Sequence, residues 1–131
     1  MEKSQSITNL TKALHLFHVK MQTIKFDAVN PHFKSKYASL SHILEEIKDP
    51  LLESGLVIVQ MPFDENGLIT QLIHTETGEY ISSTYYMKPD RATPQGYGSV
   101  LTYQRRYCIQ SLLNLSFEED DDANEIGRAH V

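Results

Sequence analysis

The hydrophobic period of this chain changes twice along its length, and this restricts its fold more than any other feature. Up to about residue 55, apolar residues recur every three or four positions, as in amphipathic helices. From about residue 56 to residue 87 the period is close to two, in segments rich in β-branched and aromatic residues. The helical period returns after Pro94. The sequence therefore predicts an α+β fold in the order helix, helix, three strands, helix.

Two helices are predicted in the first half of the chain. The first carries a long apolar stripe with helical spacing, made of Ile7, Leu10, Leu14, Phe17, Met21 and Ile24. Ser39 is a candidate N-cap for the second helix, and Gly55 is a candidate C-terminal stop. Pro50 lies inside the second apolar pattern, so we expect it to kink this helix or to restart it after an Asp49 cap.

The segments LVIVQM, LITQLIH and YISSTYYM are predicted to form a three-stranded antiparallel β-meander. Asn66-Gly67 and Thr77-Gly78 supply the turn signals between the strands. Thr93 and Pro94 then provide an N-cap and a first-turn proline for a C-terminal helix. We expect this helix to pack on one face of the sheet.

Composition limits the class of protein. A chain of 131 residues has room for one domain with a modest core. A single cysteine excludes an internal disulfide and a cysteine-rich metal site, and no apolar run is long enough to cross a membrane. We therefore expect a cytoplasmic protein without a membrane partner.

The net charge of −5 conceals a neutral body. Six of the 17 acids lie between residues 118 and 125, and one of the 12 Lys and Arg residues lies beyond residue 117, so the remainder is balanced. We expect residues 118–131 to form an acidic, mobile tail. A neutral body can still carry a local basic surface, so the acidic total does not exclude nucleic acid as a partner.

The two arginines of the last helix are predicted to have different roles. A helical wheel gives this helix an apolar face consisting of Tyr97, Val100, Leu101, Cys108, Leu112 and Leu115. Arg106 projects away from that face, next to Tyr103 and Tyr107, and this grouping suits a phosphate backbone with exposed bases. Arg105 borders the apolar face, where we expect it to pair with a carboxylate inside the subunit or across an interface. Taken alone, the same pattern also fits a solvated arginine beside half-buried tyrosines.

A second cluster of basic and aromatic residues favours the nucleic-acid interpretation. His32, Phe33, Lys34, Lys36 and Tyr37 lie in the loop before the second helix. Tyrosines can stack on any base, and lysine or arginine can neutralise phosphates without reading sequence. We therefore predict a site for single-stranded nucleic acid made of Lys34, Lys36, Tyr37, Tyr103, Arg106 and Tyr107.

The segments FKSKYASL, GLVIVQ, GSVLTYQRRYCIQSLL and EEDDD, in this order, resemble the Erf family of phage single-strand annealing proteins, named for essential recombination function. The resemblance spans about residues 8–122. Its most specific part surrounds Thr102, Tyr103, Arg105, Arg106 and Tyr107. The family commonly has Ala where this chain has Gln104, which leaves the role of that position open.

This resemblance implies a recombination protein that binds single-stranded DNA and anneals complementary strands without ATP, as a ring or filament of subunits. It implies an annealing core over residues 1–117, with a β-β-β-α arrangement, followed by the possible start of a further C-terminal region. No enzymatic activity and no cofactor or metal are expected, and phage or host recombination proteins are candidate partners. Leu10, Leu14, Phe17 and Met21 of the first helix are predicted to form subunit contacts or to support them.

Two other classes of function remain open. The carboxylates of Asp120, Asp121 and Asp122 could bind Mg²⁺ in a metal-dependent nuclease. Catalytic metal sites normally draw ligands from separate rigid elements, however, and a consecutive acid run is typical of a solvated segment. An oligomeric scaffold that binds another protein is the second alternative.

Overall fold

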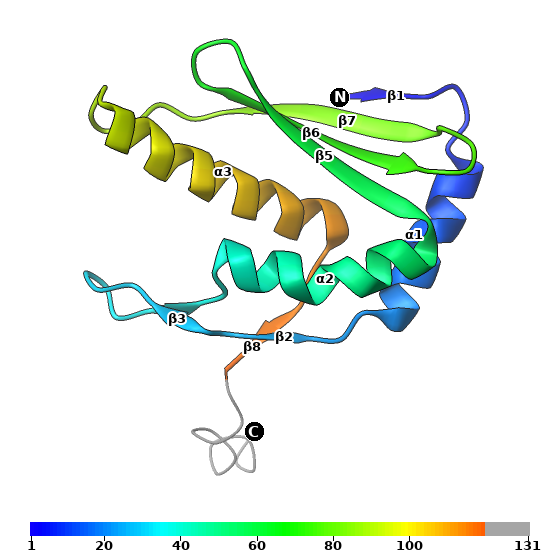
Figure 1. The fold of residues 1–131 in the computed structure, drawn as a ribbon, viewed down its shortest axis with the longest axis horizontal. Coiled ribbons are helices and arrows are strands. Elements are labelled where there is room, and N and C mark those ends of the chain that lie inside the picture. The colour runs from blue at the N-terminus through cyan, green and yellow to red at the C-terminus, as the bar shows by residue number, and fades with distance from the viewer. Residues whose placement is uncertain (120–131) are drawn as a thin grey trace.

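The computed structural model describes residues 1–119 and confirms the α+β class. Residues 1–119 form three helices and eight strands. Figure 1 shows how these elements are arranged. The helices are α1 (Thr8–Lys20), α2 (Leu40–Ser54) and α3 (Pro94–Leu113). The long strands are β5 (Leu56–Phe63), β6 (Gly67–His74) and β7 (Tyr80–Tyr86). The short ones are β1 (Glu2–Lys3), β2 (Ile24–Lys25), β3 (Ala28–Val29), β4 (Lys36–Tyr37) and β8 (Phe117–Glu118).

The predicted meander is confirmed and gains one short strand. β5, β6 and β7 pair antiparallel in sequence order, and β1 adds to the outer edge of β7, so the strand order is β1-β7-β6-β5. The register places Ile58 and Ile81 on either side of Leu72. β1 contributes two residues, pairing Glu2 with Ser82 and Lys3 with Ile81.

The helices pack on one face of this sheet (Figure 1). Strand alternation turns Leu68, Thr70 and Leu72 of β6 towards the helices, and all three are buried. The core combines them with residues from each helix, namely Leu10, Ala13, Phe17, Ile43, Ile47, Ile109 and Leu113. The other face of the sheet carries the partly or fully exposed side chains of Val57, Met61, Phe63 and Tyr86.

Local capping signals predicted the helix ends correctly. The Ser39 side chain accepts a hydrogen bond from the His42 N–H at the start of α2, and Gly55 ends that helix with φ +72°. The Thr93 side chain accepts from the Gly96 N–H, with Pro94 in the first turn of α3. These motifs act within four residues of the chain, which is why sequence is sufficient to find them.

One helix prediction was wrong in extent, and one of the two outcomes expected at Pro50 is excluded. The first helix ends at Lys20, and Ile24, which was assigned to its apolar stripe, reaches the core from β2 instead. Pro50 neither restarts α2 nor moves its cap to Asp49, because a single helix runs from Leu40 to Ser54 around it. The side chains of Ile43 and Ile47 are buried against the core. This packing stabilises the continuous helix by more than one internal proline destabilises it.

The start of α1 is held by a residue from the far end of the sheet. Its N-cap position, Ile7, provides no side-chain cap. The Glu79 carboxylate accepts instead from the Leu10 N–H (2.9 Å) and from the Asn9 side-chain amide (2.8 Å). The hydrogen bond from the Leu10 backbone is the main reason that the pKa of Glu79 lies below its ordinary value.

Two small β-pairs below the main sheet were not predicted. β3 and β4 form an antiparallel hairpin, and β2 pairs in parallel with β8 near the C-terminal end of the described chain. The Phe26 and Phe117 rings stack beside this parallel pair, with their centroids 6.3 Å apart. Glu118 and Glu119, which the sequence assigned to the acidic tail, therefore lie beside the hairpin, while residues 120–131 are outside the described part.

Candidate nucleic-acid interface

The β3–β4 hairpin, residues 28–37, carries the basic and aromatic loop that the sequence identified. Its tip is closed by hydrogen bonds from the Asn30 N–H to the Ser35 carbonyl (2.8 Å) and from the Lys34 N–H to the Asn30 carbonyl (2.7 Å). The Asn30 side chain also accepts from the His32 and Phe33 backbone. Lys34 adopts φ +55°, a conformation that costs a non-glycine residue energy.

Asp27 fastens this hairpin to the start of α2. Its carboxylate accepts from the Ser39 N–H (2.7 Å) and from the Ser39 hydroxyl (2.6 Å). Burial works against the charged carboxylate, but the hydrogen bonds from Ser39 outweigh it, and the pKa of Asp27 lies below its usual value. The sequence analysis did not select Asp27, because an acid twelve residues before a helix cap carries no local signal.

The hairpin and α3 meet at Arg106. Its guanidinium carbon lies 4.6 Å from the centroid of the Tyr37 ring and 5.4 Å from that of the Tyr103 ring. These distances are within the range of cation–π attraction. Two clusters that are about seventy residues apart in sequence are therefore brought together. We call Tyr37, Tyr103, Arg106 and Tyr107 the arginine–tyrosine cluster.

The two tyrosines of α3 extend this cluster along the helix. The Tyr103 and Tyr107 rings are 4.9 Å apart at an interplanar angle of 59°, and Tyr107 is 48% exposed. Burial, followed by the hydrogen bond with Tyr107, raises the pKa of Tyr103. Arg106 itself is half-buried next to the Tyr37 and Tyr103 rings and is not the freely solvated charge of the alternative interpretation.

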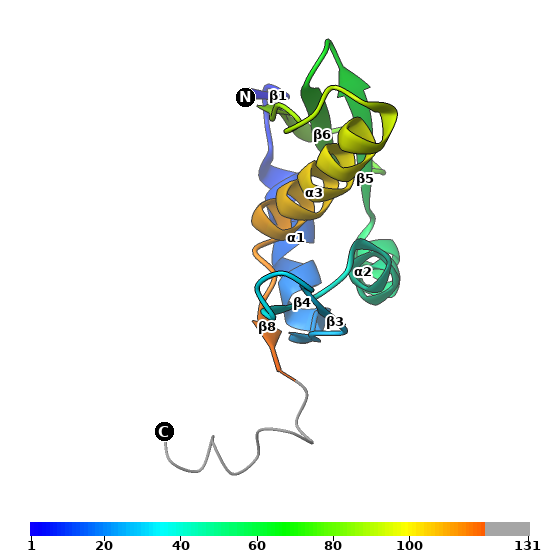
Figure 2. The same ribbon diagram turned by 90° about the vertical axis from the view of Figure 1, so that its left-hand side faces the viewer.

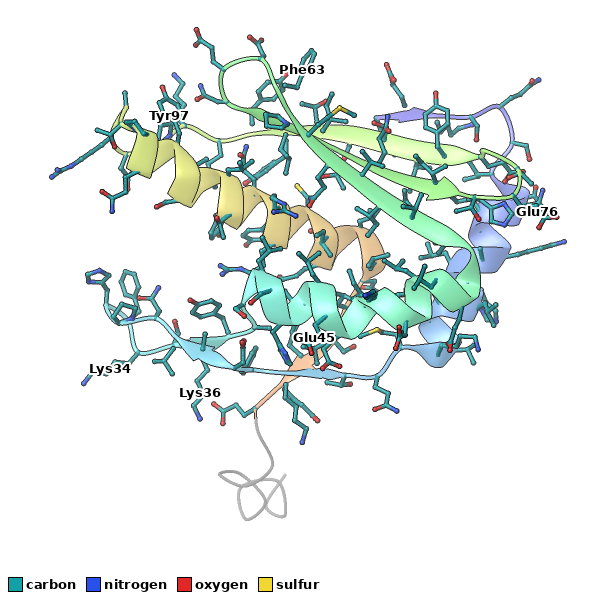
Figure 3. The ribbon with its side chains drawn as sticks, viewed as in Figure 1. Lys34, Lys36, Glu45, Phe63, Glu76 and Tyr97 are labelled. Carbon is teal, nitrogen blue, oxygen red and sulfur yellow. The ribbon has the colours of Figure 1, made fainter. Side chains whose placement is uncertain are left out.

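The two lysines of the predicted site lie apart from this cluster. Figure 3 shows Lys34 and Lys36 projecting from the side of the hairpin that faces away from α3. Strand alternation explains this for Lys36, because it precedes Tyr37 and must point to the opposite side. The Lys36 ammonium lies 3.7 Å from the Glu119 carboxylate. The hairpin thus presents an aromatic side and a basic side.

Phe33 is a further candidate for contact with bases. It is 80% exposed at the hairpin tip, the most exposed aromatic side chain among residues 1–119. The sequence analysis placed Phe33 in the basic and aromatic cluster but did not select it as a site residue. Figure 2 shows the hairpin below α3 and beside α2.

Arg105 pairs with Gln60 of β5, which is not the kind of partner that was predicted. Its Nε donates to the Gln60 side-chain oxygen (3.4 Å), and the Gln60 amide donates to the Arg105 carbonyl (3.2 Å) and to Thr70 (3.1 Å). Among residues 1–119 the guanidinium therefore contacts an amide where we expected a carboxylate. This reciprocal pair connects the middle of α3 to β5.

Gln104 is the polar centre of the contact between α3 and the sheet. It is 3% exposed, and its amide donates to the carbonyls of Asn66 (2.9 Å) and Tyr85 (3.0 Å). It joins the β5–β6 turn to the end of β7, so a long polar side chain at this position has a structural role. The buried side of α3 consists of Gln104, Ile109 and Leu113, whereas Tyr97, predicted for the core face, is exposed.

The apolar stripe of α1 is used inside the subunit. Leu10 and Phe17 are buried, and Leu14 and Met21 pack partly buried against the core. These side chains can affect subunit contacts by supporting the surface of α1. The exposed apolar residues of this helix are Leu16 and Val19.

The nuclease alternative requires a metal site at Asp120, Asp121 and Asp122, and these residues lie outside the described part of the chain. Within residues 1–119, no group of three or more His, Cys, Asp or Glu side chains is arranged to hold a metal ion. No helix in that part of the chain has the length and apolar character needed to cross a membrane.

The fold and the arginine–tyrosine cluster define a small α+β domain whose last helix presents stacked cationic and aromatic groups next to a hairpin. The chain belongs to the ERF superfamily, whose family model matches residues 10–130. Membership of this family implies a phage recombination protein that anneals single-stranded DNA. No curated protein and no solved structure matched the chain in the corresponding comparisons.

Proposed function

We propose that this protein binds single-stranded DNA at the arginine–tyrosine cluster and anneals complementary strands without ATP, as a ring or filament of identical subunits. The observation that carries the proposal is the contact of Arg106 with Tyr37 and Tyr103, which joins the hairpin to α3. Arginine stacked on aromatic rings keeps free N–H groups for phosphate, while the ring faces around it suit unpaired bases.

Each group has a separate role in this proposal. Tyr107 and Phe33 offer exposed rings on which bases stack, and Arg106 binds the phosphate between them. Lys34 and Lys36 provide a positive surface on the outer side of the hairpin and contact phosphates of the same strand. None of these groups reads a base edge, so binding is independent of sequence, as annealing of arbitrary complementary strands requires.

Assembly follows from the size of the site. One domain of this size covers a few nucleotides, whereas annealing needs long strands held in an extended form. Repeated copies of one site along a ring or filament provide that length. Formation of a stable duplex from the two strands supplies the free energy of annealing. The reaction therefore needs no nucleotide hydrolysis.

The test is annealing of two complementary fluorescent oligonucleotides in the presence of a chelator and without nucleotide. We expect the rate to exceed the spontaneous rate, and to return to it for Arg106→Ala. Strand cleavage that requires Mg²⁺ and disappears in Asp121→Asn would replace this proposal with the nuclease alternative. A protein that forms oligomers but neither binds nor anneals strands would instead be a scaffold.

A further inference from the structure

The outer face of the main sheet, which points away from the helices, carries no charge on its three long strands. Alternation puts on this face every second residue from 57 to 63, from 67 to 73 and from 80 to 86. No Asp, Glu, Lys, Arg or His is among them, although 22% of the chain is charged. Glu2 of β1 lies at the edge of this face, opposite Ser82. A face without cations does not neutralise phosphates, so its use differs from that of the arginine–tyrosine cluster.

The outer face is also apolar and exposed. Val57, Met61, Phe63 and Tyr86 are between 41% and 56% exposed. An antiparallel sheet with one solvated face normally alternates apolar and polar residues. β5 departs from this rule, because its one polar residue, Gln60, points to the helices and its outer residues are all apolar. Such a continuous apolar strand is typical of a sheet that is covered on both faces.

An amide occupies the centre of the outer face. Gln71 lies in the middle strand, opposite Val59 of β5 and Ser82 of β7. It is half-buried, and its side chain forms no hydrogen bond with another residue of the described part of the chain. An amide has both donors and an acceptor, so two glutamines that face each other satisfy each other. The centre of this face is therefore complementary to a second copy of itself.

The area of the outer face suits a partner of the same dimensions. β5, β6 and β7 have 8, 8 and 7 residues. At about 3.3 Å per residue and about 4.8 Å per strand, they cover a flat area of about 400 Å². Side chains make the accessible area of a protein surface about twice its flat area, so two such faces in contact bury about 1,600 Å². Specific interfaces bury about 1,200–2,000 Å², whereas a single helix, about 10 Å wide, covers only part of the sheet.

We propose that a second copy of this chain covers the outer face, with the two sheets packed face to face about a two-fold axis at Gln71. Sheets that pack in this way lie about 10 Å apart, with their strands about 30° from alignment. The two Gln71 amides then meet at the axis and form reciprocal hydrogen bonds, surrounded by apolar side chains. Because the contact is isologous, it closes at two copies. It goes beyond the proposed function, since the contacts of a ring or filament use other surfaces.

This pairing leaves the candidate site for DNA free. α3 packs on the opposite face of the sheet (Figure 1). Phe63 at the outer face and Lys34 and Lys36 of the hairpin lie at opposite sides of the molecule (Figure 3). Both arginine–tyrosine clusters of the pair therefore stay exposed, and pairing of subunits can be measured separately from strand binding.

A cysteine at the axis tests the contact directly. In a Cys108→Ala background of unchanged melting temperature, a short bis-maleimide should cross-link Gln71→Cys to dimers on a denaturing gel. The bands should stop at dimers even within a larger assembly, because a residue on a two-fold axis meets only one copy of itself. Thr102→Cys is the matched control, since Thr102 is exposed on α3, on the other side of the sheet, and it should stay monomeric. No dimers from Gln71→Cys, or equal dimers from both variants, would overturn the inference.

Charges at the axis give a second test without cross-linking. Gln71→Glu and Gln71→Lys each place like charges against each other, so each should lower the mass of the assembly in sedimentation to about half. A mixture of the two variants should recover the parental mass through pairs of opposite charge. The inference is wrong if both variants keep the parental mass, or if mixing changes nothing. Annealing by a protein that gives no Gln71→Cys dimers would sink the inference and leave the proposed function intact, whereas dimers without strand binding would do the reverse.

Discussion

At the scale of single residues, Arg106 differs from Arg105 in what holds its side chain. Arg106 lies between two tyrosine rings from different elements, and Arg105 is bonded to the Gln60 amide beside β5. A guanidinium between rings keeps its edge N–H groups available to an anion. A guanidinium that is hydrogen-bonded to an amide of a neighbouring strand, as in Arg105, mainly holds its helix in place.

Arg106→Ala should therefore weaken binding of every single-stranded sequence and lower the salt slope by about one unit, with melting temperature almost unchanged. Arg106→Lys keeps the charge but loses planar stacking, so we expect it to recover only part of the affinity. Fluorescence anisotropy at several salt concentrations measures both effects.

Arg105→Ala is the matched control in the same helix. It should lower the melting temperature by a few degrees or shift the sedimentation of the oligomer, since Arg105 supports β5 and borders an apolar groove between β5 and α2. If Arg105→Ala is as stable as the parent but loses DNA, the roles of the two arginines are exchanged.

Gln104 gives a prediction about stability alone. Gln104→Ala removes two hydrogen bonds inside the contact of α3 with the sheet and leaves the Asn66 carbonyl without this donor. The free energy of unfolding should fall by about 1–3 kcal/mol. Gln104→Glu should cost more, because it places a carboxylate against two carbonyl oxygens. Chemical denaturation measures both, and an unchanged midpoint for Gln104→Ala would show that water replaces the amide.

At the scale of elements, the β3–β4 hairpin joins the two halves of the candidate site. Asp27 fixes its base to the cap of α2, and Tyr37 fixes its aromatic side to α3, which leaves the tip and the basic side exposed. The hairpin is thus positioned for a ligand that passes along α3 and reaches around the hairpin edge.

Removing both hairpin lysines tests this reach. Lys34→Ala/Lys36→Ala should weaken binding of all sequences alike and flatten the salt slope by up to about two units. Lys34→Gly is a cleaner single variant, because glycine takes the positive φ of this position without strain. A salt titration that gives the parent slope for the folded double variant would remove the lysines from the site and leave the arginine–tyrosine cluster alone.

At the scale of the whole molecule, the start of the acidic run lies against the basic side of the hairpin. β8 pairs with β2 and holds Glu119 next to Lys36, on the basic side of the hairpin. A carboxylate there competes with phosphate for the same ammonium group. The contact is exposed to solvent, so its effect should be modest and sensitive to salt.

Glu119→Gln should raise affinity for single-stranded DNA about twofold to fivefold at low salt, and less at physiological salt. Glu76→Gln removes the same charge from the β6–β7 turn, at the opposite end of the molecule from the hairpin (Figure 3). Equal gains in both variants, measured by anisotropy, would show that total charge matters and the Lys36 contact does not.

The sequence by itself determined the kinds of elements and many of their ends. Hydrophobic period distinguishes helix from strand over short windows, and Ser39, Gly55 and Thr93 act on backbone groups within four residues. Helix geometry also predicted different roles for Arg105 and Arg106, since adjacent residues on a helix point about 100° apart. Each of these inferences depends on interactions that are local in the chain.

Only the tertiary structure decided which groups meet. The rotation of α3 on the sheet exposed Tyr97 and buried Gln104, and packing of α2 on the core carried a helix through Pro50. The contact of Tyr37 with Arg106 depends on how the hairpin is placed against α3. These features arise from contacts between residues that are far apart in the chain. Many alternative pairings of such residues satisfy the same local sequence pattern. The packing of the common core selects one of these pairings.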